Sequence, residues 1–149
     1  MLILSWLVFL PLAGMLAIML TPSGQERFIR LFATTITAVV FLLSAKLIVS
    51  FNMASGQIQF EEHVLWIPPL NVYYHLGVDG ISILMIFAIG LLSFLACIAS
   101  FGIKERVKEY FALYLLLETG MMGTFLALDL FLFYIFWEVV LVPMYFLIG

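Results

Sequence analysis

Two acidic residues lie deep inside long apolar segments of this 149-residue sequence. The segment Leu130–Gly149, LFLFYIFWEVVLVPMYFLIG, is long enough to cross a bilayer, which takes roughly 20 apolar residues at about 1.5 Å of rise each. Its one acid, Glu138, would therefore lie about 12 Å deep. An ionisable side chain there costs on the order of 3 kcal/mol on insertion scales and usually marks an ion or proton path. We predict that Glu138 transfers protons.

Glu118 is the second acid, and it lies in the preceding apolar segment. Counted from the short connection between the two segments, Glu118 and Glu138 share nearly the same depth. Two carboxyls that faced one another would not ionise together, which favours uptake and release of a proton near neutral pH. Residue counting gives depth but no direction around the helix axis. Whether Glu118 and Glu138 contact each other directly is therefore not predicted. Glu118 is a second candidate for proton transfer.

Other polar groups accompany Glu138 along the same predicted helix. Tyr134 precedes it by four residues and Tyr145 follows it by seven, so both phenolic groups share its face. Pro143 leaves the carbonyl of Val139, or one nearby, without its helical partner. Such a face can hold water. The alternative is a structural role, in which Glu138 is hydrogen-bonded to a neighbouring membrane helix.

The composition indicates a membrane protein. Hydrophobic residues make up 66% of the sequence and charged residues 10%, against roughly 25% charged in an ordinary soluble domain. The net charge of −3 arises from so few charged residues that it indicates neither nucleic acid nor another charged partner. We therefore predict an integral membrane protein in contact with the lipid bilayer and without nucleic acid among its partners.

The single cysteine, Cys97, cannot by itself supply a disulfide, an iron–sulfur ligand set or a zinc site. We expect it to be a packed thiol. The sequence also lacks the G-x-G-x-x-G and Walker A patterns of nucleotide-binding loops. We expect no cofactor and no metal in this chain, so that any redox chemistry takes place in other chains.

The hydropathy pattern predicts an all-α integral membrane domain over residues 1–149. The expected architecture is about five transmembrane helices, with spans near 2–20, 31–50, 80–101, 110–128 and 130–148. The first span lacks the basic region and cleavage site of a secretory signal peptide, so we interpret it as retained. An extramembrane connection is expected over 51–77, with a short strand or hairpin near Gln57–Phe60 and an extended piece at Pro68-Pro69.

Polar residues at the segment boundaries predict where individual helices begin. Asp79 and Asp129 stand where the third and fifth helices should begin, and a carboxylate there satisfies unpaired backbone N–H groups. The fourth and fifth helices are then joined by a very short connection and should be antiparallel neighbours. The two histidines, His63 and His75, lack a convincing metal-ligand spacing and are expected to form interfacial hydrogen bonds.

Basic residues predict the orientation, because Lys and Arg concentrate in cytoplasmic loops. The connections after the first and third spans carry Arg27, Arg30, Lys104, Arg106 and Lys108, whereas those after the second and fourth carry no Lys or Arg. Lys46, near the end of the second span, is expected to extend its ammonium to the headgroups. The N-terminus and residues 51–77 should then lie outside, and Gly149 should reach the cytoplasmic side.

Three stretches resemble one known family. They are FYIFWEVVLVPMYFLIG at 133–149, LETGMMGTFLALDLFL at 117–132 and YYHLGVDGIS at 73–82. They resemble the antiporter-like chain M (subunit 4 type) of proton-pumping NADH:quinone oxidoreductase, respiratory complex I, and the match covers essentially the whole chain. The resemblance implies that Glu138 is the central glutamate of the fifth helix, paired with a lysine on the seventh and feeding a line of lysines and water. Glu118 fits a position that is often acidic in the family.

The resemblance also implies a context for the chain. It would be a subunit of an oxidoreductase in the bacterial plasma membrane, with other membrane subunits, including antiporter-like ones, as partners. NADH, FMN, iron–sulfur clusters and quinone would be bound by other subunits. Family members contain further helices arranged as two inverted repeats, so we interpret this sequence as an N-terminal fragment, the product of a split gene or an incomplete part of a longer chain.

Two other classes of function remain open. Mrp-type cation/proton antiporters and membrane-bound hydrogenase complexes share the motif around Glu138, and neighbouring genes without quinone-site or iron–sulfur subunits would favour an antiporter. A membrane scaffold with no transport role would be favoured if Glu138 faced only lipid.

Overall fold

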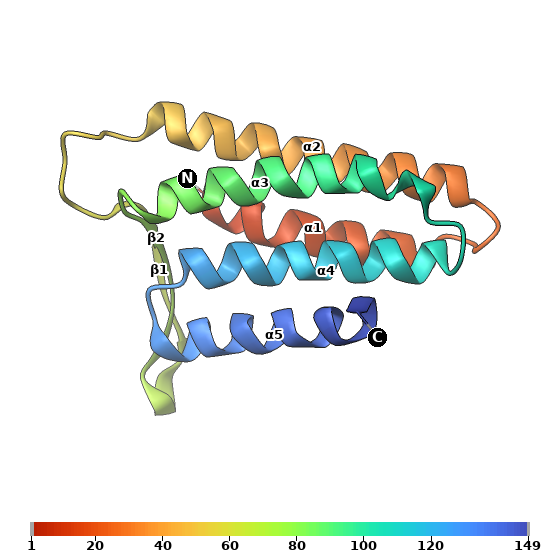
Figure 1. The fold of residues 1–149 in the computed structure, drawn as a ribbon. Helices are drawn as coiled ribbons and strands as arrows, with labels where there is room; N and C mark the ends of the chain where they lie inside the picture. Colours follow the sequence, from red (N-terminus) through yellow and green to blue (C-terminus); the bar gives the residue numbers. More distant parts are fainter. Residues whose placement is uncertain (1, 149) are drawn as a thin grey trace.

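Five long helices and one β-hairpin make up the fold (Figure 1). The structure is a computed structural model and describes residues 2–148. The helices are α1 (Ile3–Leu20), α2 (Glu26–Ser50), α3 (Ser82–Ala99), α4 (Val107–Leu126) and α5 (Leu130–Ile148), and the strands are β1 (Gln59–Ile67) and β2 (Val72–Val78). Two short 3-10 helices occupy Pro68–Leu70 and Ser100–Gly102. The predicted helical membrane fold is confirmed, while Gly149 lies outside the described residues.

Four of these helices, α1, α2, α3 and α5, are long and apolar enough to cross a membrane, with the third including residues up to Gly102. The remaining helix, α4, has 20 residues but is less apolar because it contains Glu109 and Glu118. It packs along both α1 and α5 and also touches α2 and α3. The bundle therefore shields α4 from its surroundings, which is why a less apolar sequence suffices there.

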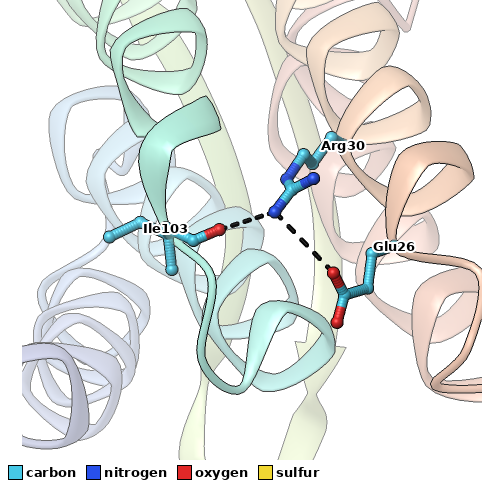
Figure 2. A network of polar contacts seen from close by, with 3 residues as sticks. All are labelled: Glu26, Arg30 and Ile103. Carbon is cyan, nitrogen blue, oxygen red and sulfur yellow. Dashed lines mark hydrogen bonds and ion pairs between the residues drawn. The ribbon is translucent and has the colours of Figure 1, made fainter.

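The basic connections lie together at one end of the bundle, and the hairpin lies across the other (Figure 1). Figure 2 shows a contact between α2 and the α3–α4 connection. The Arg30 guanidinium donates to the carbonyl of Ile103 at 2.7 Å and lies 3.8 Å from the Glu26 carboxylate. Glu26 and Arg30 are four residues apart on α2, a spacing that supports a helix. The second helix accordingly begins at Glu26, one turn before the predicted Leu31.

The hairpin of β1 and β2 is antiparallel and confirms the expected strand in the 51–77 connection. The prediction of an extended piece at Pro68-Pro69 was wrong. These prolines begin the 3-10 turn that reverses the chain, and Asn71 completes the turn in the left-handed conformation at φ 55°, which asparagine tolerates better than most residues. The backbone N–H of Leu128 donates to the carbonyl of His75 at 2.8 Å, so β2 is tied to the α4–α5 connection.

Glu62 ties the other strand of the hairpin to α1. Its carboxylate, only 6% exposed, accepts hydrogen bonds from the backbone N–H groups of Leu4 and Ser5 at 3.2 and 3.4 Å and from the Ser5 hydroxyl. The Ser5 hydroxyl also lies 2.7 Å from the Tyr74 hydroxyl. Burial raises the pKa of Tyr74, and the hydrogen bond to Ser5 partly offsets that effect. Glu62 thus supplies the N-terminal cap that α1 lacks in its own sequence.

Both predicted aspartate caps are present. Asp79 accepts from the backbone N–H groups of Ile81 and Ser82 at 2.9 and 2.7 Å, and the bond from Ser82 is the main reason that the pKa of Asp79 lies below its usual value. Asp129 accepts from the N–H groups of Phe131 and Leu132 at 2.9 and 3.2 Å. These caps fix where α3 and α5 begin, and the Asp129 cap keeps the α4–α5 connection short.

Candidate functional site

Glu118 lies in the interior of the bundle. Its side chain is 0% exposed, and neither carboxyl oxygen has a hydrogen-bond partner among residues 2–148. Buried polar groups are nearly always hydrogen-bonded, so an unpartnered carboxyl calls for a specific reason such as proton transfer or bound water. Glu118 is therefore the most unusual polar group within the membrane-crossing part of the described chain.

The side chain of Glu118 points away from α5. A Cβ on Gly120 would lie 2.7 Å from Val140 Cγ2, and one on Gly123 would overlap the ring of Phe136, so both glycines face α5. At about 100° per residue, Glu118 is rotated by roughly 160° from Gly120 and by about 140° from Gly123, nearly to the opposite side of the helix. It is directed instead towards the helices on the other side of α4.

Polar groups of α2 and α3 surround that side of α4. The Tyr114 hydroxyl, one turn before Glu118, donates to the carbonyl of Ser93. Cys97, one turn after Ser93 on α3, lies 3.6 Å from the Thr34 hydroxyl, and its predicted packing is confirmed. Our sequence reasoning did not single out Tyr114, although its four-residue spacing from Glu118 was a usable signal.

Glu138 lies on the exposed side of α5. Tyr134 and Tyr145 share this side, with exposed fractions of 59% and 75%, as their spacing predicted. Glu138 is eight residues after the start of α5 and Glu118 eight residues before the end of α4, so the two acids do share a depth. They are not brought together, because the α4–α5 contact lies between them.

The histidines lie outside the helical bundle. His63 and His75 are paired across the two strands with ring centroids 4.4 Å apart, and His75 Nε2 is 2.9 Å from a carboxylate oxygen of Glu61. This hydrogen bond agrees with the interfacial role expected from the sequence. Among residues 2–148, no hydrogen bond links this pair to Glu118 or Glu138.

Comparison with known proteins identifies the relatives of the chain. No protein-family model matches it. The NADH-quinone oxidoreductase subunit M of Rhodobacter capsulatus is 42% identical over 151 residues, covering 99% of this chain and 29% of the relative. The NADH-ubiquinone oxidoreductase chain 4 of Chondrus crispus is 39% identical over 140 residues, covering 93% of this chain and 28% of the relative. The chain thus spans about three tenths of the length of these curated relatives.

Solved structures contain the same arrangement of helices. A chain of respiratory complex I from Thermus thermophilus matches with a TM-score of 0.78 and 28% identity, over 96% of this chain and 27% of that one. A chain of the archaeal membrane-bound sulfane sulfur reductase matches with a TM-score of 0.75 at 23% identity, which shows a shared fold alone. The apolar helices and these relatives together show that the chain is an integral membrane protein. Over 93% and 99% of its length, it is a homologue of chain 4 and subunit M of these two NADH oxidoreductases.

Proposed function

We propose that the chain forms part of the proton-translocating membrane portion of an NADH-quinone oxidoreductase, with Glu118 and Glu138 as proton carriers. The observation that carries this proposal is the complete burial of Glu118 without a hydrogen-bond partner among the described residues. Leaving a buried polar group unsatisfied costs about 1–3 kcal/mol, and more for a charged group. A purely structural glutamate would be expected to satisfy its oxygens, whereas a proton carrier must remain free to gain and lose a proton.

The electron-transfer steps would take place in other subunits. The relatives are named as subunits of NADH-quinone oxidoreductases, and the one cysteine of this chain cannot hold an iron–sulfur cluster. NADH, FMN, iron–sulfur clusters and quinone would therefore belong to partner subunits, and neighbouring antiporter-like subunits would pack against this one. The chain would contribute proton transfer that is coupled to those redox steps.

Glu138 fits this role if a further helix covers the exposed side of α5. That side carries Tyr134 and Tyr145 beside Glu138, and an acid facing only lipid would be costly. Relatives are about three times as long as this chain, and we propose that a helix outside the matched part covers this side. The lysine that the family resemblance assigns as the partner of Glu138 would come from such a helix.

Glu118→Gln in the assembled complex tests the proposal. Glutamine keeps the size of the side chain but cannot carry a proton, so we expect proton pumping in proteoliposomes to fall by at least about tenfold, within the 10²–10⁴-fold range typical of lost acid–base groups. Electron transfer from NADH to an artificial acceptor should persist. The matched control is Glu109→Gln, an exposed acid in the first turn of the same helix. Normal pumping by the Glu118 variant would reduce Glu118 to a structural acid.

The proposed orientation places the basic end of the bundle in the cytoplasm of a bacterial cell and the hairpin outside the plasma membrane. Single cysteines at Ser23, Glu105 and Gln57 can test it in a Cys97→Ala background, because all three positions are exposed. An impermeant thiol reagent added to intact cells should label the Gln57 position and spare the other two. Labelling at Ser23 without labelling at Gln57 would reverse the assignment.

A further inference from the structure

A row of hydroxyl groups leads along α4 to Glu118. Tyr110, Tyr114 and Glu118 follow one another at intervals of four residues and therefore share one face of the helix. The two tyrosine rings are stacked with centroids 6.3 Å apart. The Tyr110 hydroxyl lies 2.7 Å from the Ser100 hydroxyl, and the Tyr114 hydroxyl donates to the carbonyl of Ser93. Both tyrosines thus face α3, half-buried, while Glu118 is fully buried at the inner end of the row.

A second line of polar groups runs beside this row on α2. The Thr34 hydroxyl donates to the carbonyl of Arg30 at 2.8 Å and lies 3.6 Å from the Cys97 sulfur. The Arg30 Nε is buried and has no hydrogen-bond partner among residues 2–148. Thr34 lies one turn after Arg30 on α2, and Arg30 also forms the contact shown in Figure 2.

The row continues in one direction only. Beyond Glu118, the next positions on the same face of α4 are Met122 and Leu126, and both side chains are 0% exposed. Leu126 packs in the apolar cluster beneath the hairpin together with Leu76 and Phe136. Polar groups therefore lie between Glu118 and the basic end of the bundle, whereas apolar side chains separate Glu118 from the hairpin end.

We propose that Glu118 exchanges protons with the medium at the basic end of the bundle along the row formed by Tyr110 and Tyr114. This inference rests on the proposed function and adds a route and a direction to it. A proton arriving on water at Tyr110 is passed inward, each hydroxyl or intervening water giving its own proton to the next acceptor and taking one from the preceding donor. The net change is one proton added to the Glu118 carboxylate, and no electrons move. Release follows the same steps in reverse.

Tyr114 controls the last step of this route. Its hydroxyl donates to the carbonyl of Ser93 in the described arrangement, so it must rotate away from that carbonyl before it can donate towards Glu118. Tyr110 is the entry group, because it is paired with Ser100 at the bundle end. A phenylalanine at either position removes the relay hydroxyl, together with its hydrogen bond to Ser100 or Ser93, and keeps the packed ring.

The Glu118 carboxyl itself reports on the route, because its C=O stretching band shifts when its O–H proton exchanges for deuterium. The protein is reconstituted in lipid nanodiscs and transferred to D₂O, and the rate of this shift is followed by infrared spectroscopy. Glu118→Gln assigns the band. We expect the Tyr110→Phe/Tyr114→Phe double variant to exchange about tenfold more slowly than the unmodified chain, as two lost hydrogen-bonding groups would cause.

The control is Tyr73→Phe, which removes a hydroxyl from the hairpin and should leave the exchange rate unchanged. Unfolding of the double variant would accelerate exchange, the opposite of the expected change. A double variant that exchanges at the unmodified rate, or an unmodified chain whose Glu118 carboxyl does not exchange at all, would overturn the route. Pumping by the assembled complex separates the two proposals: normal pumping by Glu118→Gln refutes the proposed function, whereas normal exchange in the double variant refutes only the route.

Discussion

Glu138→Gln is expected to abolish most of the proton pumping of the assembled complex. Glutamine preserves the size and hydrogen-bonding capacity of the side chain but cannot carry a proton, so a structural role predicts little change and a relay role predicts a loss of about 10²-fold or more. Because redox chemistry and translocation are coupled, quinone reduction should also fall. Electron transfer from NADH to an artificial acceptor should survive. Proton uptake by proteoliposomes, measured alongside both electron-transfer rates, distinguishes these outcomes.

Two further variants help to distinguish a proton-relay role of Glu138 from a structural role. Glu138→Asp keeps the carboxyl but withdraws it by one methylene, and a displacement of about 1 Å can already be costly, so partial activity is expected. Glu105→Gln removes an exposed acid from the α3–α4 connection and should pump normally. An unchanged ratio of protons pumped to electrons transferred in Glu138→Gln would make Glu138 a structural residue and favour the scaffold interpretation.

The site was predictable in depth but not in direction. Counting residues from the α4–α5 connection placed Glu118 and Glu138 at one level, and the structure has both eight residues from that connection's helix ends. Their directions depend on which faces of α4 and α5 meet, and both helices are apolar on nearly all sides. The two glycines that determine the contact, Gly120 and Gly123, look like ordinary small residues until the facing Phe136 and Val140 are known.

The fold was predictable where a local rule applies. Hydropathy located the helices, and the short side chains of Asp79 and Asp129 marked the starts of α3 and α5. The helix α2 extends to Glu26, ahead of the predicted span at 31–50, because Glu26 and Arg30 pair along the helix, and hydropathy does not register such polar residues. The turn at Pro68–Leu70 was missed because it depends on the left-handed conformation of Asn71, which no hydropathy pattern reveals.

Gly123→Val is expected to destabilise the bundle strongly. A Cβ at this position would overlap the ring of Phe136, and a rigid ring on the opposite helix leaves little room to adjust. Overpacking a close contact typically costs 1–3 kcal/mol of unfolding free energy, about 2 kcal/mol in the middle of that range. Intrinsic helix propensity favours valine over glycine and therefore acts in the opposite direction. Unfolding in detergent micelles, followed by circular dichroism, measures the difference.

A matched glycine and a compensating change identify the cause. Gly102→Val is the control, because a Cβ there would have no neighbour within 4 Å. Adding Phe136→Ala to Gly123→Val removes the ring and should make the double variant less unstable than the sum of the single effects. Equal stability of Gly123→Val and the unmodified chain would show that α4 and α5 do not approach as closely as described.

The hydrogen bonds between Glu62 and α1 constrain the order in which the elements assemble during synthesis. The carboxylate that caps α1 belongs to a residue 57 positions after Ser5 in the chain. Glu62 is synthesised after both α1 and α2, so the backbone N–H groups of Leu4 and Ser5 must be solvated until it arrives. Their final partner arrives only after α2 has inserted and the hairpin has reached the same side of the membrane. Formation of the hydrogen bonds between Glu62 and the start of α1 therefore completes the packing of the first two helices with the hairpin.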